Sequence, residues 1–132
     1  MSTSLPLLLF KPVALIFAAS CVFTGAQALV NPLTFSQLFG IQVPKDKDTL
    51  LLRSYITLMA TRQLATGIIL LLLARIGQWI AIAYILMVMG IIVAGMDGVF
   101  IAQNGSRKMG IVHAGPGFGI AAMAAAIIYT EG

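Results

Sequence analysis

Charged residues are scarce in this sequence. Of its 132 residues only 9% are Asp, Glu, Lys or Arg, whereas 60% are hydrophobic, and the mean hydropathy is +1.02. In soluble domains, about a quarter of all residues are charged. Most of the surface of this chain must therefore face something other than water. The composition excludes a soluble globular domain and indicates an integral membrane protein.

Histidine and cysteine are nearly absent as well, with one residue of each. A zinc site takes three or four His, Cys or carboxylate ligands, so we predict no metal site and no cofactor. Cys21 lies in an apolar segment without a neighbouring base, which argues against a cysteine nucleophile. Seven methionines are better explained as fillers of an irregular core. No basic stripe with interleaved aromatic residues is present, so no nucleic-acid partner is expected.

Long stretches of the chain carry no charge, for example from Arg75 to Asp97 and from Lys108 to Glu131. About 20 apolar residues cross a hydrocarbon core ~30 Å thick. Only helices satisfy their backbone within a single span, and the apolar runs lack the two-residue alternation of a barrel. The sequence predicts an all-α, integral membrane four-helix bundle formed by a single domain over residues 1–132. Its spans cover about residues 5–30, 50–73, 77–102 and 110–129.

The connections between these spans differ in length. Short turns at residues 75–78 and 103–108 predict that the second, third and fourth spans are antiparallel neighbours. The link over residues 31–49 is long. It starts with Asn31-Pro32 and holds Phe35, Leu38 and Phe39, which predicts a short amphipathic turn at the membrane interface, before the polar stretch 45–48.

The first span also has features of a cleaved signal peptide. An apolar stretch over residues 13–23 is followed by Ala26-Gln27-Ala28, an A-x-A pattern. The residues before Lys11 are themselves apolar and carry no positive cluster, so we favour a retained first helix.

Lysine and arginine in short loops set the orientation of membrane spans. One side of the predicted bundle carries Lys11 and Arg75. The other side carries Lys45, Lys47, Arg53, Arg107 and Lys108. The second set is larger, so it is expected in the cytoplasm, and both termini are expected to be non-cytoplasmic. The endoplasmic reticulum is one candidate compartment.

Three polar residues interrupt the spans, and they are the candidate catalytic residues: Arg62, Asp97 and His113. At ~1.5 Å per residue, Asp97 and His113 lie roughly 9 and 8 Å from the turn that joins their helices. Arg62 lies roughly 16 Å from the same side, and its long side chain can extend toward the surface. Charged groups are costly at such depths unless paired. We therefore expect the three side chains to converge.

Neighbouring positions extend this candidate site. Tyr55 and Thr66 share a helical face with Arg62, and Gly117 lies one turn after His113. These three residues are the predicted substrate-binding positions. Pro116 removes one helical hydrogen bond beside His113, which predicts a kink. In the alternative interpretation, Arg62, Asp97 and His113 only brace the bundle.

The order of these features resembles a family of small four-helix membrane proteins from fungi and bacteria, classed as a domain of unknown function. The resemblance rests on Asn-Pro after the first helix, Leu38-Phe39-Gly40, the stretch 62–67, Asp97 and His113. It implies a shared Arg/Asp/His site, and work on a lipophilic small molecule, because some fungal members are encoded among secondary-metabolite genes. Ala60 stands where the family has Gly, and Gln63 where an acidic residue is common, so the motif is imperfect.

Three functions remain open on this basis. The first is binding of a hydrophobic small molecule in secondary-metabolite biosynthesis, with a cofactor-free isomerisation, cyclisation or hydration at Asp97, His113 and Arg62. The second is a non-catalytic membrane accessory or scaffold. The third is an oligomeric small transporter. The expected partners are membrane lipid and a hydrophobic small molecule, with self-association as a further candidate.

The orientation can be tested with glycosylation acceptor tags placed at each terminus. Both tags should be modified, because the lysine and arginine bias places both ends outside the cytoplasm. An unmodified C-terminal tag on a chain that keeps its first span would contradict this orientation. A mature N-terminus near Leu29 would show signal-peptide cleavage.

Overall fold

The computed structural model describes residues 4–38 and 49–132, and the secondary structure of this part is helical. Four apolar helices of 25 or 26 residues are each long enough to cross a membrane, which confirms the predicted fold class. The polar stretch 45–48 lies outside the described residues. The elements in chain order are α1 (Leu5–Val30), α2 (Pro32–Leu38), α3 (Thr49–Arg75), α4 (Trp79–Val88), the π-helical η1 (Met89–Val93), α5 (Ala94–Asn104) and α6 (Arg107–Glu131).

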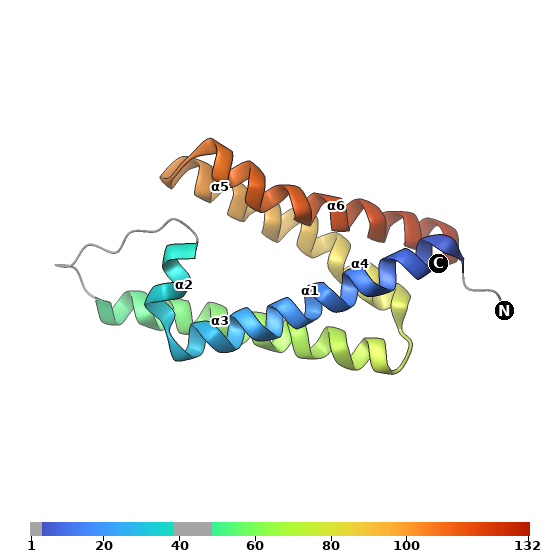
Figure 1. Ribbon diagram of the computed structural model, residues 1–132, viewed down its shortest axis with the longest axis horizontal. Coiled ribbons are helices and arrows are strands. Elements are labelled where there is room, and N and C mark those ends of the chain that lie inside the picture. The colour runs from blue at the N-terminus through green and yellow to red at the C-terminus, as the bar shows by residue number, and fades with distance from the viewer. Residues whose placement is uncertain (1–3, 39–48) are drawn as a thin grey trace.

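The long helices form two pairs (Figure 1). In the first pair α1 packs along α3, and in the second pair the continuous α4–η1–α5 helix packs along α6. The pairs meet near the two chain termini and diverge toward α2. The sequence correctly predicted that the third and fourth spans are neighbours. The main neighbour of α3, however, is α1 and not the α4–η1–α5 helix.

Glycine explains the close approach within the first pair. A Cβ atom on Gly25 would lie 2.7 Å from the backbone nitrogen of Leu64, and one on Gly67 would lie 2.8 Å from the carbonyl oxygen of Ala18. Lipid is as apolar as the helix surfaces, so helices in membranes associate through such close packing and through interhelical hydrogen bonds. One of these bonds joins Gln63 Nε2 to Thr24 Oγ1 at 2.6 Å.

The second pair uses the same device more extensively. A Cβ atom on Gly90 would overlap the carbonyl oxygen of Gly117, and one on Gly98 would lie 2.5 Å from Cβ of Ala114. The backbones of the two helices therefore touch. The π-helical segment η1, in which Gly90 lies, was not predicted from the sequence.

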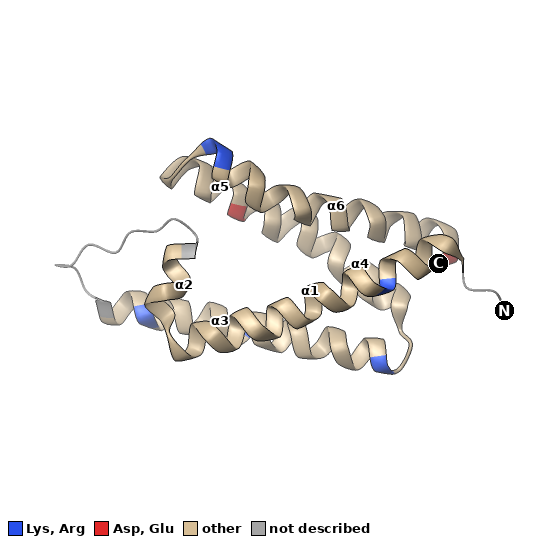
Figure 2. Cartoon of the chain, viewed as in Figure 1, with Lys and Arg blue, Asp and Glu red and all other residues tan. Residues whose placement is uncertain are grey.

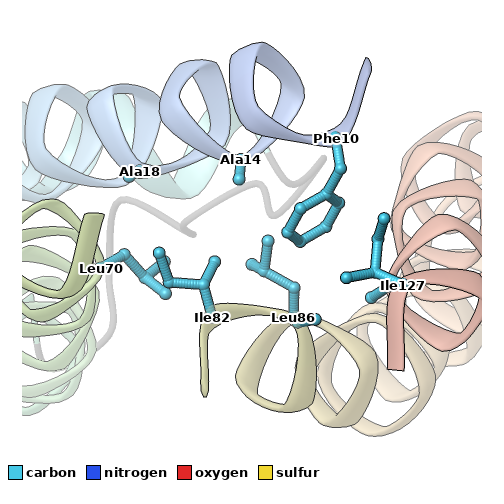
Figure 3. Packing of buried hydrophobic residues seen from close by; sticks show 9 residues of the cluster. Phe10, Ala14, Ala18, Leu70, Ile82, Leu86 and Ile127 are labelled. Carbon is cyan, nitrogen blue, oxygen red and sulfur yellow. The ribbon is translucent and has the colours of Figure 1, made fainter. Parts of the chain in front are cut away.

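The two pairs are joined, at the end where they meet, by one hydrophobic cluster, which we call the central cluster. Its largest fully buried side chains come from all four long helices (Figure 3): Phe10, Leu70, Ile82, Leu86 and Ile127. Lys11 lies over the ring of Trp79 at 5.2 Å, which adds a cation–π contact between α1 and α4 at this end. At the opposite end, Phe35 of α2 is buried against α1 and α3.

Gly90→Ala should destabilise the second pair, because its methyl group would overlap the Gly117 carbonyl. Overpacking of this kind costs about 1–3 kcal/mol, so the thermal midpoint in detergent should fall. Gly119→Ala is the matched control, since a Cβ atom there meets nothing within 4 Å. An equal change of the thermal midpoint in both variants would show that the contact between Gly90 and Gly117 does not contribute to stability.

Candidate functional site

Asp97 and His113 lie side by side on the second pair. The Gly98 contact with Ala114 holds α5 and α6 together at this level. His113 Nε2 lies 3.8 Å from Asp97 Oδ2, within ion-pair distance but beyond a hydrogen bond. Both helices leave the same short turn, which explains why the two residues lie at one depth, as predicted. The side chains are 33% exposed for Asp97 and 38% for His113, so a small molecule can reach both.

A groove of about 470 Å³ opens beside His113. Its walls are formed by three apolar side chains, those of Ile101, Met109 and Val112, and by the nitrogen-bearing side chains of Lys108 and His113. Of these five residues, only His113 was predicted as a site residue from the sequence. Met109 lies one turn before His113, and this spacing was available as a signal. Such a lining suits a molecule that is mostly apolar and carries few polar groups.

A proline in α6 and a π-helical segment in the neighbouring helix lie near the Asp97–His113 pair, although α6 itself stays α-helical through the proline. Pro116 lies inside α6 and has no N–H group, so the carbonyl of Val112 loses its helical donor. Across the interface, Gly90 of η1 contacts Gly117. π-Helical segments recur at functional sites in proteins, and here one lies opposite a proline.

Arg62 does not join the pair. Within residues 4–38 and 49–132, no Cα atom of α3 lies within 8 Å of a Cα atom of α5 or α6, and the ion pair found there is Asp97–His113. Arg62 is exposed near the middle of α3. The predicted convergence of three side chains is therefore not observed. Its physical reason is that α3 is held against α1 by Gly25 and Gly67, while the second pair diverges from the first.

The other predicted site residues lie in different surroundings. Tyr55 is 60% exposed on α3. Thr66 donates its hydroxyl to the carbonyl of Arg62 at 2.9 Å. A Cβ atom on Gly117 would overlap Ala94, which gives Gly117 a packing role in the second pair.

Most charged residues of the described part lie near the ends of the long helices (Figure 2), whereas Arg62 and Asp97 lie within apolar spans. Among the described residues no group of three or more His, Cys, Asp or Glu side chains is placed to hold a metal ion. The thiol of Cys21 is free and buried in α1.

These features define a small four-helix membrane protein with a partly exposed Asp–His pair. Residues 18–127 match the model of the family described as Domain of unknown function (DUF4267), and the chain belongs to that family. The matched range includes Arg62, Asp97 and His113. No curated protein and no solved structure matches the chain.

Proposed function

We propose that this protein binds a lipophilic small molecule within the membrane and moves a proton on it with Asp97 and His113. One observation carries the proposal, namely the 3.8 Å contact between a carboxylate and an imidazole that are both partly exposed in apolar spans. Ionisable groups are rare at such positions, and they usually mark functional sites.

The roles of the two residues follow from their chemistry. The imidazole is the group that exchanges a proton near neutral pH, so His113 acts as the acid and base. Asp97 orients the ring and stabilises its protonated form. The reaction class that fits is a cofactor-free isomerisation or cyclisation, in which the proton removed from one atom is returned at another. A hydration would add one water molecule to the substrate.

The biological setting rests on the family resemblance. Fungal members encoded among secondary-metabolite genes support a lipophilic metabolite as substrate, in a membrane such as the endoplasmic reticulum. The groove beside His113 supports the same class, because its lining is mostly apolar. Figure 1 shows the start of α1 and the end of α6 at the same end of the bundle, an arrangement that either orientation in the membrane shares.

The test compares metabolites in cells that lack the protein with cells that carry the wild type, Asp97→Asn or His113→Gln. Both variants should lose the product by about 10²–10⁴-fold, the usual contribution of general acid–base catalysis. Glu131→Gln is the matched control, because it removes an exposed carboxylate at the end of α6. Stability in detergent is measured for the same proteins.

Two results would overturn the proposal. Full product formation by a well-folded His113→Gln protein would eliminate His113 as the acid and base. Rescue of both stability and product formation in the Asp97→Leu, His113→Leu double variant would show that the pair only braces α5 against α6.

A scaffold function is the second candidate, and two glycines favour it. Gly115 and Gly119 lie one turn apart on an exposed face of α6, and a Cβ atom on either meets nothing within 4 Å. This G-x-x-x-G spacing is typical of helix dimers in membranes. The other exposed helix surfaces of this chain carry mainly large apolar side chains.

If this face binds a second copy, Gly115→Leu and Gly119→Leu should shift the protein from dimer to monomer in crosslinking and light scattering. Ala125→Leu is the control, because it places a leucine side chain at another exposed position of α6. A wild-type monomer in lipid nanodiscs would contradict the scaffold function.

A further inference from the structure

Helical spacing places Arg62 on a face of α3 that packs, near its other end, against the central cluster. Leu73 packs against the central cluster, which includes Ile82 and Leu86 of α4. Thr66 and Arg62 precede Leu73 by seven and eleven positions, close to two and three turns at ~3.6 residues per turn. Arg62 and Thr66 therefore share the face of Leu73. Tyr55 lies on it as well, five turns before Leu73.

His113 lies on the corresponding face of α6. Ile127 is buried in the central cluster, and Ile120 packs against that cluster. His113 precedes Ile120 by seven positions, as Ile120 precedes Ile127. The same heptad spacing holds on α1, where Phe10 is buried in the cluster and Phe17 packs against it. Thr24 lies seven positions after Phe17. The faces that build the core at one end therefore become polar toward the end where the pairs diverge.

Arg62 lacks a counter-charge within the described residues. It is thirteen positions from each end of α3, or about 20 Å at ~1.5 Å per residue. A charge this deep in a membrane requires a partner or water. The carboxylate of Asp97 lies beside His113, and no Cα atom of α3 lies within 8 Å of a Cα atom of α5 or α6. Since the described residues offer Arg62 no acidic partner, its charge can be balanced by an anion from another molecule.

We propose that the two pairs bind a lipophilic carboxylic acid, with its carboxylate on Arg62 and its apolar body extending toward His113. The inference rests on the proposed function and adds the substrate class to it. A guanidinium holds a carboxylate through two parallel N–H···O bonds. Arg62 is here a binding residue on the first pair, and Asp97 and His113 act on the second.

The depth of Arg62 distinguishes this ligand from a phospholipid. Phosphate groups of lipids stay at the surface of the ~30 Å hydrocarbon core, whereas Arg62 lies near the middle of its span. A carboxylic acid can enter the core in its neutral form and ionise beside the guanidinium. A phosphodiester stays charged at physiological pH and cannot follow the same route.

The test measures binding of cis-9-octadecenoic acid and of the alcohol with the same chain to the full-length protein in nanodiscs, by native mass spectrometry. Wild type should prefer the acid at least tenfold, and Arg62→Gln should abolish the preference. Arg62→Lys should retain part of it, because it keeps the charge and loses the two-bond geometry. Arg75→Gln, which removes an exposed cation at the end of α3, should bind like wild type.

Three outcomes would overturn the inference. They are equal binding of acid and alcohol by the wild type, an equal loss in Arg75→Gln and Arg62→Gln, and full competition by an anionic phospholipid. The proposed function is scored separately by His113→Gln, which should keep acid binding and lose product. If the wild type shows no preference for the acid but product formation still depends on His113, the carboxylic acid is rejected as the ligand. The proposed roles of Asp97 and His113 are then retained.

Discussion

Contact between helix backbones at glycine holds each half of this protein together. In lipid there is little hydrophobic drive for two apolar helices to associate, so packing and interhelical hydrogen bonds must supply it. Gly25 and Gly67 provide the close approach in the first pair, and Gly90 and Gly98 in the second. The pairs are joined to each other by the larger side chains of the central cluster at one end. The two helices of each pair are thus packed closely along their length, while the two pairs contact each other mainly at one end.

This division determines where polar groups can lie. Asp97 and His113 come from helices in backbone contact, so their side chains meet without spanning a gap. Arg62 comes from the other pair, and the local junction leaves it apart from both. The heptad positions that carry Phe10, Leu73 and Ile127 at the closed end carry polar residues further along the same helices. One repeating pattern therefore supplies the core and the candidate site.

Much of this architecture is encoded in features that a single sequence exposes. Predominantly apolar segments of about 20 to 26 residues predict four spans, and the short turn after Asn104 predicts that Asp97 and His113 lie at one depth. The pairing of α1 with α3 was not predictable in this way. It depends on which glycine faces which backbone, and the long link between these helices sets no register. The π-helical turn at Gly90 was not predictable from the sequence either, because it is associated with the close packing of Gly90 against Gly117 and not with the helix propensity of its own residues.

The separation of Arg62 from Asp97 also bears on the bracing interpretation. A bracing ion pair would bring the charges of the two halves together and neutralise them inside the protein. Here Asp97 lies beside His113 within its own pair, and among the described residues Arg62 on the other pair has no acidic partner. A cation that stays unmatched at mid-membrane carries an energetic penalty, which an incoming anion would relieve. Under the proposed function, that relief supplies affinity for an acidic ligand.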